Sequence, residues 1–376
     1  MRIANTTDSR KSTNSFTQSR PKGAPFGFDS VRVPSIESIV TDKYDARLAY
    51  IMSVIAAWSY SDERALADKL RYYGIEKSRV RRISVQNDAL LVVATAYFVQ
   101  SASGRVGVLA FRGTDPASFV TVLADGEVMQ RSFFGGAVHS GFYANVEAVW
   151  DEVMECLDAA RQNAHIEDAK GTRAGLACPL EALYITGHSL GGAMAVLAAA
   201  RLFGGDCDPK IIKGVYTFGQ PMVGNKAFSE RCRGAFGDKL FRHVYRDDVV
   251  PHLPPTSAIP YEHTGKELHA ASVVENWKDG YPASQRACPA GALFEVGFNA
   301  VEARLYPRKM AGYSIDDHMP ANYLDVSRYT IDPTSVADGV RRRGWTQSLA
   351  EIPHDVGMAV RKLLRRRNGD SGGAQT

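Results

Sequence analysis

The stretch that decides the fold of this chain is ALYITGHSLGGAMAVLAAARLF, residues 182–203. The apolar run at 183–185 predicts a short strand that ends just before a serine. From Ser189 onward, small residues and strong helix formers predict a helix, and Gly204-Gly205 predict its end. A strand, a sharp turn and a helix with a serine at the corner have the geometry of a nucleophile elbow. The elbow pentad is Gly187-His188-Ser189-Leu190-Gly191.

The glycines around Ser189 follow from what a serine nucleophile needs. The strand-to-helix corner lifts the serine Oγ out of the sheet in a strained backbone conformation. Side chains two positions before and two positions after the serine would collide in so tight a corner, which explains Gly187 and Gly191. The helix that starts here also offers unpaired N–H groups and its positive dipole end to a developing oxyanion.

A serine nucleophile needs a base to take its proton and a buried carboxylate to hold that base in the right tautomer. In the α/β-hydrolase architecture these groups follow the serine, acid first and histidine second, on loops at the carboxyl edge of the sheet. His318 is the predicted base among nine histidines, because it lies in a late polar loop after a predicted helix. His188, inside the elbow, is predicted to point away from the base. The acid is Asp247 or Asp248, and pattern alone does not choose between them, because adjacent side chains point opposite ways.

Strands and helices alternate along the rest of the chain. This alternation predicts an α/β protein of the α/β-hydrolase fold, with a mostly parallel central sheet and helices on both faces. Residues 89–99 and 106–111 are expected to pair as a hairpin. The other strands expected after the elbow are 211–218, 240–245 and 261–269, and the expected helices are 44–73, 142–161, 226–236 and 292–305.

Composition divides the chain into three parts. Residues 1–34 predict a disordered basic leader, residues 35–340 the hydrolase domain, and residues 341–376 a basic extension with an amphipathic helix over 353–367. The leader carries a net charge of +4 and the extension +5, so the overall charge of +4 leaves the body at −5. This distribution argues against nucleic-acid binding by the body, and it leaves contact of the two ends with anionic lipid open.

The cysteines and the first 30 residues bear on the compartment. The five cysteines are scattered without metal-type spacing, which favours reduced thiols and predicts no metal site. The first 30 residues contain no apolar core of a signal peptide, and no segment reaches the ~18 apolar residues of a membrane span. We therefore expect a cytoplasmic protein, or one that is exported by a non-classical route.

Five motifs occur in order along residues 45–325. They are FRGT at 111–114, VHSGF at 138–142, GHSLGG at 187–192, FGQPMVG at 218–224 leading to DVVPHLP at 248–254, and His318 followed by Tyr323. In this order and spacing the chain resembles the class 3 lipases, the family of filamentous-fungal triacylglycerol lipases and their bacterial and plant relatives. We expect a bacterial-like member of this family. Its basic ends and the lack of a recognisable signal peptide and of an obvious disulfide set distinguish it from the secreted fungal members, and these differences argue against an extracellular location and dietary-fat-type substrates.

The resemblance also assigns individual residues. The family's acid directly precedes the Val-Val-Pro-His run, which selects Asp248 over Asp247. The resemblance places the two oxyanion donors at the backbone N–H groups of Thr114 and Leu190. The family's lid lies between residues 114 and 138, where Phe133-Phe134 could add to an apolar face that opens at a lipid surface. A second interpretation stays open, in which this segment is a loop packed on the body. The candidate lid residues are Phe119, Val120, Val122 and Leu123.

The function implied by the resemblance is that of a serine carboxylic-ester hydrolase, a lipase that cleaves acylglycerol esters without a metal or cofactor. His318 would take the proton of Ser189 as Oγ attacks an ester carbonyl, so activity should fall in acid as the imidazole is protonated. The expected partner is a lipid or ester substrate, with transient contact to a lipid surface. Phospholipase A1, galactolipase and short-chain carboxylesterase activities would use the same residues and stay open. So does a non-catalytic α/β-hydrolase body that binds a ligand.

Overall fold

The structure is a computed structural model that describes residues 31, 33–72, 75, 77–87, 92–114, 129–166, 175–254, 260–280, 309–310 and 313–336. Most of the predicted leader, all of the predicted extension and the predicted helix at 292–305 lie outside the described residues. So do the four candidate lid residues Phe119, Val120, Val122 and Leu123.

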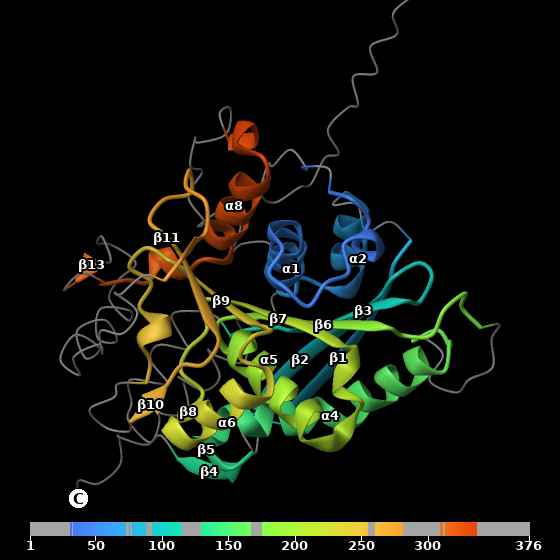
Figure 1. Cartoon of the computed structure of the whole chain (residues 1–376), viewed down its shortest axis with the longest axis horizontal. Coiled ribbons are helices and arrows are strands. Elements are labelled where there is room, and N and C mark those ends of the chain that lie inside the picture. The colour runs from blue at the N-terminus through green and yellow to red at the C-terminus, as the bar shows by residue number, and fades with distance from the viewer. Residues whose placement is uncertain are drawn as a thin grey trace, which may run out of the picture.

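An eight-stranded sheet forms the centre of the protein, in the order β1-β2-β3-β6-β7-β9-β11-β12 (Figure 1). The five strands from β3 to β11 run parallel, and the strands at the two edges pair antiparallel. The expectation of a mostly parallel sheet is therefore confirmed. Its strands are β1 (Arg79–Asn87), β2 (Val92–Gln100), β3 (Val106–Phe111), β6 (Ala182–His188), β7 (Ile212–Phe218), β9 (Leu240–Tyr245), β11 (Lys266–Ala270) and β12 (Lys278–Asp279).

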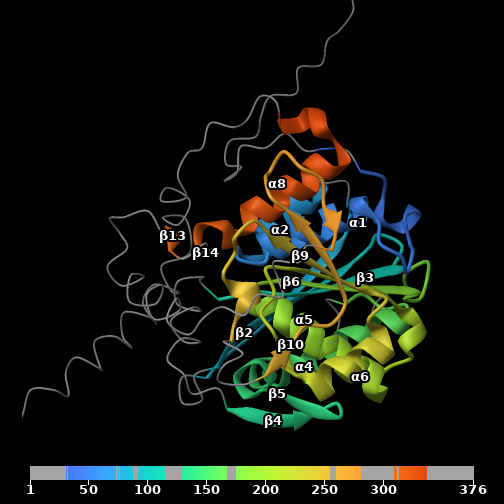
Figure 2. The same ribbon diagram turned by 60° about the vertical axis from the view of Figure 1, so that its left-hand side comes forward.

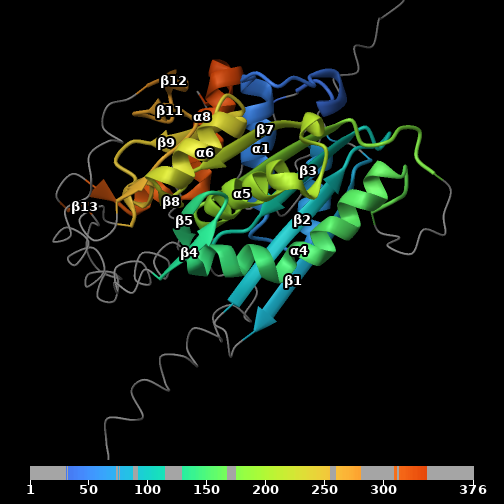
Figure 3. The ribbon, with the colours of Figure 1, turned by 60° about the horizontal axis from the view of Figure 1, so that its bottom comes forward.

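Helices cover both faces of the sheet, as expected for this architecture. On one face lie α1 (Ala46–Trp58), α2 (Glu63–Tyr72) and α8 (Pro320–Ile331), and α8 packs beside α1. On the other lie α4 (Ser140–Arg161) and α5 (Leu190–Arg201), with α6 (Lys226–Phe236) next to them (Figure 3). Each face has its own apolar core, because the central parallel strands are buried on both sides.

A smaller antiparallel sheet, in the order β10-β8-β5-β4, packs against α4 and α6, away from α1 and α8 (Figure 2). A two-stranded ladder, β13-β14, leads into the last part of the fold. The strands of these two sheets are β4 (Gln130–Phe133), β5 (Gly136–His139), β8 (Gly224–Asn225), β10 (Tyr261–Glu262), β13 (Lys309–Met310) and β14 (Tyr313–Ser314).

The elbow helix α5 is buried all the way round, from Leu190 to Ala200. Its sequence is almost entirely alanine, glycine and other small or apolar residues, so α4 and the strands β6 and β7 can all approach it closely. The regular helix stops at Arg201 and continues as a wide turn in which Gly205 has φ of 131°. The two glycines predicted to end the helix lie in this turn.

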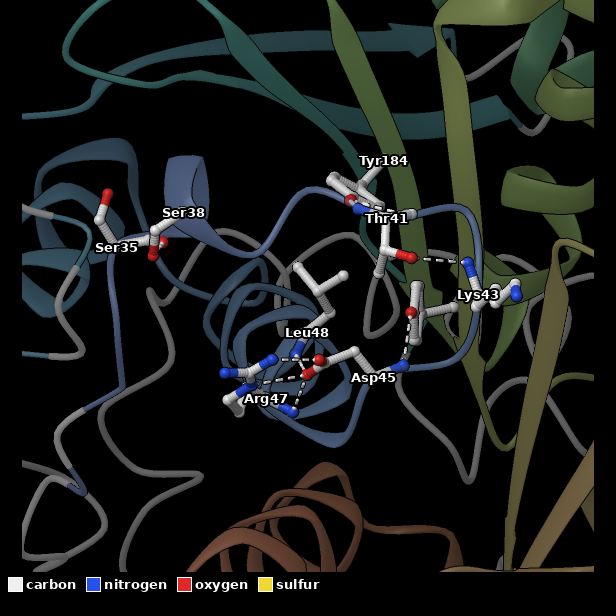
Figure 4. Close-up of polar contacts among 9 residues, drawn as sticks. Ser35, Ser38, Thr41, Lys43, Asp45, Arg47, Leu48 and Tyr184 are labelled. Atoms are coloured by element: carbon white, nitrogen blue, oxygen red, sulfur yellow. Dashed lines mark hydrogen bonds and ion pairs between the residues drawn. The ribbon is translucent and has the colours of Figure 1, made fainter.

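Hydrogen bonds from tyrosine hydroxyls of the sheet hold the segment that precedes α1 (Figure 4). Tyr184 of β6 accepts a hydrogen bond from the backbone N–H of Thr41 (3.0 Å) and donates one to its carbonyl oxygen (2.9 Å). Tyr216 of β7 accepts from the N–H of Asp45 (3.4 Å). The Asp45 carboxylate in turn caps α1 by accepting from Arg47 and Leu48. These bonds fix α1 over the strand that carries the elbow.

Three expected elements differ in the structure. The single helix expected at 44–73 is two helices, because Asp62 caps a new one by accepting from the N–H of Ala65 (2.8 Å). The strand expected at 261–269 splits at Gly265, whose φ is 86°, and its halves join different sheets. Strand β1 was not expected at all, although it pairs along its whole length with β2.

Two general properties complete the description. Within the described residues, no helix combines the length and apolar content that crossing a bilayer requires. The four described cysteines, Cys156, Cys178, Cys207 and Cys232, have free thiols. Burial raises the pKa of the Cys156 thiol to about 11, so this thiol is protonated and unreactive at neutral pH.

Candidate active site

The predicted elbow forms between β6 and α5. Ser189 has φ of 60° and ψ of −131°, a strained conformation for a residue with a side chain. A Cβ at Gly187 would lie 2.2 Å from the carbonyl oxygen of Gly191, so the collision expected within the corner is real. A Cβ at Gly191 would lie 2.1 Å from the carbonyl oxygen of Phe111, so this glycine is needed because of the neighbouring strand β3.

The acid and the base come together at the carboxyl edge of the sheet. The Asp248 Oδ2 atom lies 2.7 Å from His318 Nδ1, and both side chains are fully buried. Two further donors hold the carboxylate: the backbone N–H of Val250 to Oδ1 (2.8 Å) and the hydroxyl of Tyr323 to Oδ2. The carboxylate beside His318 therefore belongs to Asp248, the aspartate that the family motif selects over Asp247.

Backbone contacts join the loops of the acid and the base. The N–H of Ser314 donates to the carbonyl oxygen of Asp247 (2.7 Å), and Ser314 and Asp248 form an isolated parallel bridge. The Ser314 hydroxyl then accepts from the N–H of Asp317 (3.2 Å), at the start of the short 3₁₀ turn Asp316–His318. Hydrogen bonds between the two loops therefore place His318 next to the acid.

The buried atoms that lack a hydrogen-bond partner among the described residues include Ser189 Oγ and His318 Nε2. A buried polar atom without a partner costs about 1–3 kcal/mol, so folds keep few of them and often at functional sites. Here the two are the hydroxyl expected to attack and the nitrogen expected to take its proton. His318 Nδ1 is already engaged by Asp248, which leaves Nε2 as the free basic position.

The segment with the predicted oxyanion donor passes directly against the elbow. A Cβ at Gly113 would lie 2.5 Å from the carbonyl oxygen of His188 and 3.1 Å from Ser189 Cβ, so only glycine allows this approach. Thr114 follows at once. Leu190 is the first residue of α5, and its N–H therefore has no partner within the helix. The structure places both residues beside Ser189; their role as donors stays a prediction.

His188 lies against the base, so the expectation that it points away from it was wrong. Its Nε2 is 2.7 Å from the carbonyl oxygen of His318, and the two ring centroids are 4.5 Å apart. Its Nδ1 is 2.9 Å from the hydroxyl of Tyr60, which lies between α1 and α2. Sequence reasoning missed Tyr60 because no local pattern links it to a residue 128 positions further along.

Burial sets the protonation of the groups around the base. It lowers the pKa of His188 well below its usual range, with a further contribution from the neighbouring His318, so His188 is neutral at physiological pH. Burial and the negative charge of Asp248 raise the pKa of Tyr323 well above its usual range. The hydroxyl therefore stays protonated and donates a hydrogen bond to the Asp248 carboxylate. Within the described residues, no cluster of His, Cys, Asp or Glu side chains could hold a metal ion.

The aromatic pair considered for the lid is part of the body. Phe133 and Phe134 are half-buried, and both rings pack against Phe228 of α6, with centroids 6.3 and 6.5 Å away. Phe133 also meets Tyr143 edge to face at 5.0 Å. For this pair the structure agrees with the second interpretation, a segment packed on the body, because both rings lie against α6.

Comparison with known proteins identifies related sequences. Residues 108–258 match the family described as Lipase (class 3). The chain is 30% identical over 191 residues to a lipase of Rhizopus niveus, a stretch that covers 50% of this chain and 44% of that one. It is 32% identical over 210 residues to the secreted mono- and diacylglycerol lipase 1 of Fusarium solani, covering 53% of this chain and 54% of that one. The chain thus spans about half the length of the curated relatives it matches.

Solved structures share the fold. The lipase of Rhizopus microsporus var. chinensis superposes with a TM-score of 0.50 at 20% identity, over 80% of this chain and 96% of that chain. A Rhizomucor miehei lipase–propeptide complex gives a TM-score of 0.50 at 23% identity, over 72% and 78% of the two chains. The α/β-hydrolase fold expected from the sequence is confirmed by these similarities and by the observed sheet.

Proposed function

We propose that this chain is a member of the class 3 lipase family and a serine carboxylic-ester hydrolase that cleaves acylglycerol esters. One arrangement carries the proposal. His318 Nδ1 is held by a buried aspartate, while His318 Nε2 and Ser189 Oγ are both buried without a partner. Neither atom is engaged by another described group, so each is available for the proton transfer that a serine nucleophile and its base require.

The proposed reaction has two halves. The Ser189 Oγ attacks the ester carbonyl carbon and passes its proton to His318 Nε2, while Asp248 stabilises the imidazolium that forms. The N–H groups of Leu190 and Thr114 hold the tetrahedral oxyanion. His318 then protonates the departing alcohol, which leaves an acyl-enzyme. Water attacks the acyl-enzyme in the second half, gives its proton to His318 and releases the carboxylic acid.

Acylglycerols are the proposed substrates because relatives that match this domain are named as lipases, one of them for mono- and diacylglycerols. A panel of triacylglycerol, monoacylglycerol, phosphatidylcholine and p-nitrophenyl esters of increasing chain length tests this assignment. Preference for phosphatidylcholine, or for short soluble esters alone, would overturn the acylglycerol assignment.

The nucleophile is tested with a fluorophosphonate probe, which labels an activated serine covalently. Ser189→Ala should abolish labelling and lower kcat on the order of a million-fold, because the acyl-enzyme can no longer form. Ser132→Ala is the matched control: it removes the same hydroxyl from an exposed position on β4 and should label like the wild type. Labelling that survives in Ser189→Ala would reject the proposed nucleophile.

A further inference from the structure

Three segments that are distant in sequence meet at His188. The first carries the base: the carbonyl oxygen of His318 lies 2.7 Å from His188 Nε2. The second is the turn between α1 and α2, whose Tyr60 hydroxyl lies 2.9 Å from His188 Nδ1. The third carries Gly113, where a Cβ would lie 2.2 Å from the same hydroxyl and 2.5 Å from the carbonyl oxygen of His188. Gly113 immediately precedes the predicted oxyanion donor Thr114.

The hydrogen bonds allow only one neutral tautomer of His188. A carbonyl oxygen can only accept, so His188 Nε2 carries the proton and donates it to His318. The other nitrogen, Nδ1, then has a lone pair, and the hydroxyl of Tyr60 donates to it. Both nitrogens of a fully buried ring are thereby satisfied, which gives the ring one orientation. The two partners, one at each ring nitrogen, thus fix both the tautomer and the orientation of His188.

We propose that His188 is a positioning residue that, together with Tyr60, aligns the base His318 with Ser189 and holds the Thr114 segment in register with both. The inference rests on the proposed function, since it assumes that His318 is the base. The mechanism is geometric. The His188 N–H binds the backbone carbonyl of His318, and Asp248 binds its ring Nδ1, so the residue is held at one point on its backbone and one on its ring. With one point lost, the ring can turn about the other.

Two substitutions separate the two hydrogen bonds. Glutamine can place its amide N–H₂ where the histidine has Nε2, so His188→Gln keeps the donor to His318. Asparagine is shorter and can place its oxygen where the histidine has Nδ1, so His188→Asn keeps only the acceptor for Tyr60. Because the bond to His318 holds the base, His188→Asn should lower kcat about 100-fold with little change in KM, the effect of a misplacement of about 1 Å. His188→Gln should stay within about tenfold of the wild type.

Tyr60→Phe tests the other end of the contact. It removes the hydroxyl that orients His188 and should lower kcat about tenfold, less than His188→Asn, because the bond to His318 remains available. Tyr184→Phe is the matched control. It removes a buried tyrosine hydroxyl with two hydrogen bonds from the same strand that carries His188, but those bonds hold Thr41 and lie away from the site. It should change the melting temperature and leave kcat per active site unchanged.

Active-site titration distinguishes positioning from loss of structure. The amplitude of fluorophosphonate labelling counts the folded, competent molecules, and its rate constant reports the reactivity of each one. The proposal expects full amplitude and a reduced rate constant in His188→Asn, with the rate restored in His188→Gln. Reduced amplitude with a wild-type rate constant would overturn it, and so would equal rates in the two variants. Labelling that persists in Ser189→Ala would instead reject the proposed function itself, so the two failures are distinguishable.

Discussion

Lowering the pH from 7 to 4 is expected to destabilise the fold through His139, the residue that caps α4. Its Nδ1 accepts hydrogen bonds from the backbone N–H groups of Gly141 (3.1 Å) and Phe142 (3.4 Å), and its ring stacks on Phe142 with centroids 4.0 Å apart. Both bonds need the lone pair of Nδ1, which protonation at this nitrogen removes. Burial lowers the pKa of His139 from 6.5 to about 4.

The sign and size follow from linkage. A histidine whose pKa is lowered by folding binds its proton more readily in the unfolded chain. Its contribution to stability is therefore fully present above about pH 6.5 and is lost as the pH falls towards 4. Each unit of pKa shift corresponds to about 1.4 kcal/mol, so His139 alone should remove about 3 kcal/mol across this range. That is a large part of the ~5–15 kcal/mol that stabilise a typical domain.

The assay compares urea unfolding of the wild type and His139→Asn at pH 7, 6, 5 and 4, followed by tryptophan fluorescence. Asparagine can still cap the helix but does not titrate in this range. Other buried histidines also destabilise both proteins in acid, and the difference between the two removes their contribution. We expect His139→Asn to gain about 3 kcal/mol relative to the wild type between pH 7 and 4. Parallel stability curves would refute the assigned role.

Three further changes have defined outcomes. Burial raises the pKa of Asp325 from 3.8 to about 6 although Arg328 Nη2 lies 3.4 Å from its carboxylate, so stability is lost as the pH rises from about 4 through 6. Asp325→Asn also removes the partner of Arg328 at every pH, but its effect on stability should be more favourable at pH 7.5 than at pH 4 by roughly 2–3 kcal/mol, measured by urea unfolding. Gly191→Ala should prevent the elbow from forming and abolish fluorophosphonate labelling. Gly234→Ala is its control: this glycine lies on the exposed side of α6, with nothing within 4 Å of a new Cβ, and the substitution should raise stability by about 0.5–1 kcal/mol. Tyr323→Phe removes a donor from the buried Asp248 carboxylate and should cost about 2 kcal/mol in the same unfolding assay, together with a fall in kcat.

Each of these has an opposite result that would count against its reasoning. Equal gains for Asp325→Asn at both pH values would mean that the carboxyl is not penalised by burial. Normal labelling in Gly191→Ala would show that the backbone of β3 can shift to make room for a methyl group at this position. Unchanged stability in Tyr323→Phe would place the hydroxyl outside the network around Asp248.

Secondary structure that depends on residues close together in the sequence was predictable. The elbow, α4, α6 and the strands β7 and β9 depend on periodicity and on glycines a few positions apart, and all of them appear close to their expected bounds. The break between α1 and α2 was also local, because Asp62 is an ordinary N-cap residue, but it was overlooked within an apolar stripe. The strand β1 carries a weaker apolar alternation than its neighbours, and its pairing with β2 is what makes it regular.

By itself the sequence determined the features that depend on residues close together in the chain: a serine at a strand-to-helix corner and the glycines that such a corner requires. It also supplied the later candidates for the base and the acid, one histidine and a pair of aspartates. The motif that places an acid directly before Val-Val-Pro-His had already selected Asp248, and the tertiary structure places its carboxylate against His318. Only the tertiary structure decided that His188 binds the backbone carbonyl of His318 and that Tyr60 binds His188. It also placed Phe133 and Phe134 in the body of the protein. The physical reason is that backbone conformation is set mainly by near neighbours, whereas the partner of a buried polar atom is set by packing between segments far apart in the sequence.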